Sequence, residues 1–123
     1  MNNHRKLTCH CAKVEIDVYF RTGRLQNIRH CNCSLCKRKV AVIAAVPVED
    51  LTIIKGNEYL SCYQWNTMTA EHYFCKNCGI YTHHKRRSNP SQYGINIACI
   101  DGVDPFAFDT VPIGNGDLSA ELP

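Results

Sequence analysis

Cysteine is the residue type with the clearest chemical potential in this 123-residue chain. Nine cysteines are present, and seven of them fall in three short clusters within residues 9–11, 31–36 and 75–78. Thiolates gathered in this way are preferred ligands of zinc, which takes four protein donors in a structural site and three in a site with an open position. The clusters therefore indicate metal binding.

Two kinds of spacing occur within the clusters. In a C-x-C pair such as Cys9 and Cys11, an extended backbone directs both sulfur atoms to one face, because side chains alternate along a strand. The C-x-x-C pair Cys75 and Cys78 requires a tight turn instead, and Gly79 suits it because glycine adopts positive φ without steric cost. We expect the backbone amides of that turn to point at the sulfur atoms.

Two groupings of the seven clustered cysteines are compatible with this spacing. The first grouping has a closed four-cysteine site and an open three-cysteine site: Cys9, Cys11, Cys75 and Cys78 in the former, Cys31, Cys33 and Cys36 in the latter. The alternative is a zinc ribbon whose two knuckles are Cys33/Cys36 and Cys75/Cys78, although the gap between these pairs is wider than that motif usually has. The first grouping predicts two zinc ions per chain, and the open site is expected to be occupied more weakly because it has fewer ligands.

The odd number of cysteines argues against a framework of disulfides. Residues 1–7 contain neither an apolar core nor a cleavage signal, so we expect a cytoplasmic protein whose thiols stay reduced. The longest apolar run, Val40 to Val46, is far shorter than the about 20 residues of a membrane-spanning helix, so no membrane partner is expected.

Two cysteines and the histidines stand outside these clusters or beside them. Cys62 and Cys99 lie alone in apolar segments and are predicted to be small buried core residues. The six histidines are interpreted as solvated or hydrogen-bonded side chains, with His4 in a loose terminus.

Strands must position the clusters, because the hydrophobic pattern has a period of two. Val14, Ile16, Val18 and Phe20 alternate with polar residues, which predicts a half-buried strand. Further strands are expected over residues 25–30, 40–46, 51–55, 59–65, 70–74, 79–84 and 93–100, with at most one helical turn within 34–39. The chain is thus predicted to be one mainly β domain over 1–123, with a zinc-binding core at about 7–104 and an irregular tail at 105–123.

The formal charge of +3 treats cysteines as neutral. Seven thiolates and two zinc ions would bring it to zero, which argues against general electrostatic binding of nucleic acid. Two basic segments remain, and their cations are interpreted either as solvated loop charges or as groups that recognise carboxylates of a small acidic ligand. The candidates for the second role are Lys37, Arg38, Arg86 and Arg87.

The order of the clusters resembles the glutathione-dependent formaldehyde-activating enzyme family, which also includes the domain of centromere protein V. The resemblance rests on Cys9-His-Cys11, the segment Cys31–Lys39 and Phe74-Cys-Lys-Asn-Cys-Gly79, and it extends to about Asp104. Ala12 departs from the pattern, because a glycine usually follows the first pair. The resemblance implies a β-tent fold of short antiparallel strands with little helix. It also implies a structural zinc on the four-cysteine set and a second zinc, linked to catalysis and glutathione, on Cys31, Cys33 and Cys36.

Three functions compete at this point. The first is an enzyme that places the thiol of glutathione on the second zinc and joins it to formaldehyde, giving S-hydroxymethylglutathione; run backwards, this is a carbon–sulfur lyase reaction. The second is a module that binds glutathione or another small thiol without turnover, and the third is a zinc-stabilised scaffold for interactions. The enzyme is distinguished from the other two by a rate enhancement: glutathione should react with formaldehyde, or with another small aldehyde, faster in the presence of the protein than without it.

Overall fold

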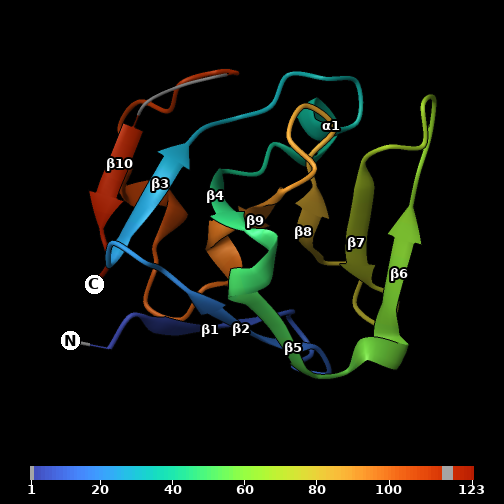
Figure 1. The fold of residues 1–123 in the computed structure, drawn as a ribbon, viewed down its shortest axis with the longest axis horizontal. Coiled ribbons are helices and arrows are strands. Elements are labelled where there is room, and N and C mark those ends of the chain that lie inside the picture. The colour runs from blue at the N-terminus through green and yellow to red at the C-terminus, as the bar shows by residue number, and fades with distance from the viewer. Residues whose placement is uncertain (1, 115–117) are drawn as a thin grey trace.

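The computed structural model describes residues 2–114 and 118–123, and ten strands in these ranges form three antiparallel sheets (Figure 1). The strands are β1 (His4–Thr8), β2 (Glu15–Tyr19), β3 (Arg24–Ile28), β4 (Ile43–Pro47), β5 (Leu51–Lys55), β6 (Leu60–Tyr63), β7 (Glu71–Cys75), β8 (Tyr81–Lys85), β9 (Gln92–Asn96) and β10 (Leu118–Glu121). The helical elements are short: α1 (Cys36–Lys39) and four 3-10 turns at Val48–Asp50, Asn57–Tyr59, Ile97–Cys99 and Pro105–Ala107. The predicted mainly β fold class is confirmed.

The largest sheet has the strand order β4-β9-β8-β7-β6, and it positions most of the functional side chains. A second sheet has the order β1-β2-β5, and β10 pairs with β3 in a third. Arg29, directly after β3, forms an isolated bridge with Ile43 of β4, so β3 and the large sheet lie side by side.

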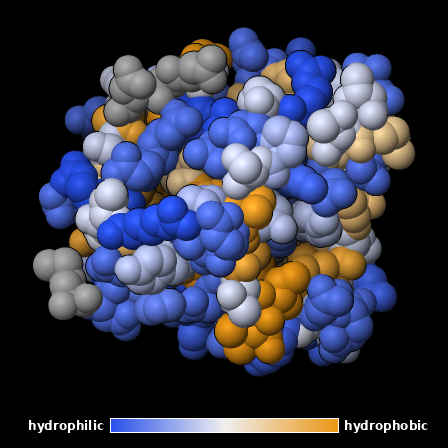
Figure 2. Space-filling view, in the orientation of Figure 1, coloured by the Kyte–Doolittle hydropathy of each residue, from blue (hydrophilic) through white to orange (hydrophobic). Residues whose placement is uncertain are grey.

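The core lies between the sheets and follows the alternation of the sequence. Ile16 and Val18 of β2 are fully buried, whereas Glu15 and Asp17, which alternate with them, remain partly exposed. Ile95 of β9 and Ala44 of β4 are also fully buried, and they are cross-strand partners. Figure 2 shows a mainly hydrophilic outer face with an apolar strip in the region of β5, where Ile54 is 55% exposed.

The two ends of the chain differ from what the sequence pattern predicts. His4 begins β1 and its Nδ1 lies 2.8 Å from Asp17 Oδ2, so this histidine is part of a sheet instead of a loose terminus. Within the segment expected to be an irregular tail, β10 pairs with β3 through Leu118↔Ile28 and Ala120↔Leu25. The tail therefore contributes a strand, β10, that pairs with a strand about 90 residues earlier in the sequence. Local patterning does not encode such a pairing.

In the described residues, no helix combines the length and the apolar character that a bilayer crossing requires.

Candidate metal and substrate site

Four cysteine sulfur atoms from two distant segments meet at one end of the large sheet. Cys9 and Cys11 follow β1, Cys75 ends β7, and Cys78 lies in the turn after it; all four Sγ atoms are within 4.8 Å of one another. Cys11 Sγ lies 3.6 Å from Cys9 Sγ and 3.7 Å from Cys75 Sγ. A tetrahedron with zinc–sulfur bonds of about 2.3 Å has edges of about 3.8 Å, so the donor set and its spacing fit zinc.

The local geometry of the first pair differs from the predicted extended segment. Residues 10–12 form a turn in which the Ala12 amide donates to Cys9 O at 3.2 Å, and Ala12 has a φ of 64°. Both pairs therefore use tight turns, since the Gly79 amide donates to Cys75 O at 2.7 Å with φ at 79°. Ala12 occupies a conformation that glycine adopts more readily.

The four thiols are electrostatically unequal. A hydrogen bond from Asn77 lowers the pKa of Cys11 to about 6, whereas burial raises the pKa of Cys9 to about 11. The Val14 amide donates to Cys9 Sγ at 3.4 Å, which partly offsets the burial. A bound cation would complete the set by favouring all four thiolates.

Three more sulfur atoms gather around the start of α1. Cys31, Cys33 and Cys36 have all three Sγ atoms within 4.8 Å of one another, and the Cys36 amide donates to Cys33 Sγ at 3.3 Å. Burial raises the pKa of the Cys36 thiol, so a cation is needed to hold three thiolates together here. The structure thus assembles the four-plus-three grouping, and the two knuckles of the alternative zinc ribbon lie in different clusters.

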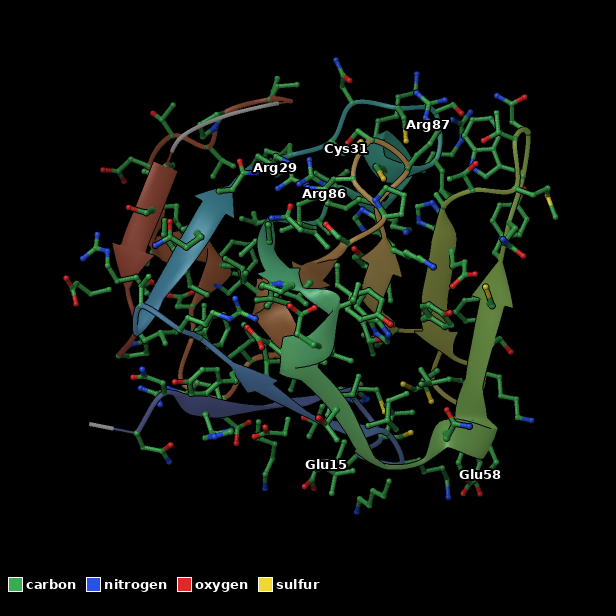
Figure 3. The ribbon with its side chains drawn as sticks, in the orientation of Figure 1. Glu15, Arg29, Cys31, Glu58, Arg86 and Arg87 are labelled. Carbon is green, nitrogen blue, oxygen red and sulfur yellow. The ribbon has the colours of Figure 1, made fainter. Side chains whose placement is uncertain are left out.

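The three-cysteine cluster opens into a cavity of about 220 Å³. Three arginine side chains also line it: Arg29 after β3, and Arg86 and Arg87 after β8. Figure 3 shows Arg29, Cys31, Arg86 and Arg87 gathered at the same end of the molecule, beside α1. Trp65 and its neighbours Asn66 and Thr67, in the β6–β7 connection, form another part of the wall.

The predicted carboxylate-binding cations separate into two groups. Arg86 and Arg87 line the cavity, whereas Lys37 and Arg38 do not line it and are exposed. Arg38 instead donates to Ser34 O at 2.5 Å. Arg86 is held by a 2.5 Å hydrogen bond from Nη1 to Gln92 Oε1.

Arg29 is a cavity residue that sequence reasoning missed. It is only 4% exposed, and burial, with a smaller contribution from the positive charge of Arg86, lowers its pKa. Its Nη1 donates to Asn27 O at 2.9 Å. An arginine two positions before the second cysteine cluster was the available signal, but only the pairing of residue 29 with Ile43 turns this position inward.

A second missed group consists of two buried histidines that line the cavity and a lysine beside them. His72 and His84 are 5% and 6% exposed and both line it. Their rings stack with centroids 5.1 Å apart. Lys39 Nζ lies 2.9 Å from His72 Nδ1 and 3.7 Å above the centre of the Tyr81 ring. The expectation that histidines here are hydrogen-bonded agrees with these contacts.

The two lone cysteines do not behave alike. Cys62 is exposed on β6, so the prediction that it is a core residue is wrong. Cys99 is half-buried and packs against the core, with its Sγ 3.7 Å from Tyr81 O.

Comparison with known proteins identifies one family. The sequence profile described as "Glutathione-dependent formaldehyde-activating enzyme" matches residues 4–111. Proteins of Emericella nidulans and Penicillium rubens named "Putative glutathione-dependent formaldehyde-activating enzyme" are 29% and 28% identical over 80 residues, which cover 62% of this chain. The aligned part is only 40% and 41% of the length of these two relatives.

A solved structure gives a longer match. The crystal structure of a Rhodobacter sphaeroides protein superposes with a TM-score of 0.84 at 48% sequence identity, covering 89% of this chain and 99% of that one.

Proposed function

Because the chain belongs to the glutathione-dependent formaldehyde-activating enzyme family, we propose that it is a zinc-dependent enzyme that joins glutathione to formaldehyde. The product of this carbon–sulfur bond formation is S-hydroxymethylglutathione, and the reverse reaction is that of a carbon–sulfur lyase. Another small aldehyde could take the place of formaldehyde. A reducing, cytoplasmic location suits both the nine thiols of the chain and a glutathione substrate.

The observation that carries this proposal is the shared lining of one cavity. Three cysteine thiols and three arginines face the same space of about 220 Å³. Glutathione has one thiol and two carboxylates, so a cavity with thiolate-bound metal and guanidinium groups matches both kinds of group.

Two zinc ions per chain would serve different ends. Cys9, Cys11, Cys75 and Cys78 provide four donors, which suits a structural ion that contributes folding free energy. Cys31, Cys33 and Cys36 provide three, which leaves a position for a substrate thiol. When bound there, zinc would lower the pKa of that thiol and favour its thiolate at neutral pH.

The arginines orient the substrate. Arg86 is already fixed through Gln92, so its guanidinium loses little further entropy when it binds a carboxylate. Burial of Arg29 strengthens its electrostatic interaction with an anion, because little water screens the charge. Arg87 is exposed at the rim and would contribute a weaker, screened interaction.

Titration of the zinc-loaded protein with glutathione tests the proposal. We expect binding of glutathione and much weaker binding of S-methylglutathione, which has the same carboxylates but a blocked sulfur. Exchange between free formaldehyde and S-hydroxymethylglutathione, measured by NMR at equilibrium, should be faster with enzyme than in glutathione alone. Binding without faster exchange would support a non-catalytic thiol-binding module instead, and absence of binding would contradict both.

A further inference from the structure

We propose that His72 is a catalytic residue whose Nε2–H donates a hydrogen bond to the aldehyde oxygen, and that Lys39 positions it by fixing its tautomer. This inference rests on the proposed function, because it assigns a role in that reaction. It concerns a buried polar side chain that lines the cavity and that has no role in binding zinc or carboxylates.

The contact between Lys39 and His72 determines which ring nitrogen carries the proton. Lys39 Nζ lies 2.9 Å from His72 Nδ1. An ammonium group has three donors and no acceptor, so Nδ1 must accept this hydrogen bond. A neutral imidazole that accepts at Nδ1 carries its proton on Nε2.

The same ring is held in the neutral state. Burial, with a smaller contribution from the positive charge of Lys39, lowers the pKa of His72 to about 4. Lys39 is itself held over the face of Tyr81, 3.7 Å from the ring centre, and His84 stacks on His72 at an interplanar angle of 16°. The imidazole therefore has a fixed orientation and a fixed donor at neutral pH.

The donor nitrogen has access to the cavity. In the described part of the chain, every fully buried side-chain nitrogen or oxygen has a hydrogen-bond partner. His72 Nε2 has no protein partner among these residues, so it is not fully buried, and the ring lines the cavity that holds the three cysteines. His72 is also outside the group of sulfur atoms that lie within 4.8 Å of one another, so it remains available as a donor.

His84 is a weaker candidate for this role. Its Nδ1 pairs with the Tyr81 hydroxyl at 2.5 Å. A hydroxyl both donates and accepts, so this contact does not fix the tautomer as an ammonium group does. The His84 ring also lies beside Gly94, since a Cβ atom added there would come within 2.4 Å of Cε1 and 2.9 Å of Nε2.

The proposed reaction requires a hydrogen-bond donor beside the aldehyde oxygen. The sulfur lone pair of the glutathione thiolate forms the carbon–sulfur bond, and the π electrons of the carbonyl group move to its oxygen. The Nε2–H of His72 stabilises that developing negative charge as a hydrogen-bond donor and keeps its proton. Water then protonates the alkoxide, and the hydroxide left behind neutralises the proton that the thiol released earlier.

Substitution of His72 separates catalysis from binding. His72→Leu should lower kcat for S-hydroxymethylglutathione formation about 100-fold, the usual effect of losing one oxyanion donor. Its Kd for glutathione should stay within about twofold, because sulfur and carboxylates are bound by other residues. His72→Gln keeps an amide N–H near the position of Nε2 and should recover most of the rate. His83→Leu is the matched control, because His83 is a buried histidine of the same sheet that does not line the cavity.

Imidazole ¹⁵N NMR tests the role of Lys39 without reference to activity. The wild-type His72 should give the pattern of an Nε2–H tautomer, and Lys39→Met should give a mixture of tautomers, with Lys39→Arg restoring the single form. An Nδ1–H tautomer in the wild type, or full activity of His72→Leu, would overturn the inference. Absence of any rate enhancement by the wild-type enzyme would instead contradict the proposed function, while the tautomer would still report on the Lys39–His72 pair.

Discussion

Cys11 and Cys75 are 64 positions apart in the chain, and their Sγ atoms lie 3.7 Å apart. Cys11 follows β1 of the three-stranded sheet, and Cys75 ends β7 of the five-stranded sheet. A metal ion bound here would tie the two sheets directly to each other. Because a chain of this size has a modest core, such a cross-link would supply a substantial part of the folding free energy.

Cys78→Ser should therefore destabilise the whole domain. Serine is a poor zinc ligand, and three remaining thiolates would have to share a buried site with weaker metal binding. We expect a loss of at least about 3 kcal/mol, which lowers Tm by about 10 °C or more in a domain of this length. Thermal unfolding followed by circular dichroism, with zinc per chain measured on the same sample, checks this.

The control for that substitution is Cys62→Ser. Cys62 is an exposed cysteine outside both clusters, so its replacement should leave Tm and zinc content unchanged. A Cys78→Ser protein as stable as the Cys62→Ser protein would contradict a structural role for the four-cysteine cluster.

The grouping of the cysteines was predictable from the sequence, but the geometry behind it was not. The expected extended conformation of Cys9–Cys11 is a turn, and Ala12 supplies its positive φ in place of the glycine that usually follows such a pair. The spacing of cysteines in the sequence limits which sulfur atoms can bind the same ion, and this holds for an extended segment and for a turn alike. The alternation of residues along β2 likewise predicted a strand, but the pairing of that strand with β1 and β5 is seen only in the structure.

Cys36→Ser should have the opposite profile from Cys78→Ser. Its cluster lines the cavity and comes from one short segment, so losing a ligand there removes no link between sheets. We expect a folded protein with Tm within about 3 °C of the wild type, about one zinc per chain instead of two, and no measurable glutathione binding. Calorimetric titration and metal analysis test this, and an unfolded Cys36→Ser protein would mean that the two clusters have been assigned the wrong roles.

Cation placement shows where sequence reasoning stops. Lys37 and Arg38 directly follow Cys36, and Arg86 comes eight positions after Cys78, but of these three cations only Arg86 lines the cavity. The short helix α1 leaves Lys37 and Arg38 exposed, whereas Lys39 contacts His72 and Tyr81. A four-residue helix has too little periodicity in its sequence for that distinction to be predicted.

Arg86→Met should weaken glutathione binding about tenfold, because it removes one charge-assisted contact to a carboxylate while keeping most of the side-chain volume. Arg38→Met is the matched control: it makes the same change in charge outside the cavity and should alter Kd by less than about twofold. Titrations at two ionic strengths separate the local contact from a general charge effect. Equal losses for both variants would assign carboxylate binding to the overall charge of this end of the molecule.

Gly94→Ala should destabilise the large sheet. A Cβ atom at residue 94 would lie 2.4 Å from Cε1 of His84, whose ring is held by the Tyr81 hydroxyl and by stacking on His72. Because the ring cannot move freely, we expect a cost of about 1–3 kcal/mol. Urea unfolding of the single variant and of Gly94→Ala with His84→Ala tests the mechanism. The double variant should lose less stability than the sum of the single ones, and strict additivity would rule out this contact as the cause.

Acid should destabilise the protein partly through His83. This ring is 1% exposed, lies 4.7 Å from the ring of Tyr73 and meets the edge of Tyr93, and burial lowers its pKa to about 4. Between pH 6.5 and about 4 the unfolded chain binds a proton here that the folded chain does not, so stability falls as the pH falls through that range and is unaffected by this group above it. His83→Phe retains an aromatic ring without the titration, and its Tm should decline less steeply from pH 6.5 to 4.5 than that of the wild type. Parallel Tm curves for the two proteins would assign the acid sensitivity to other groups, foremost the cysteines of the two clusters, whose protonation would release a bound metal ion at low pH.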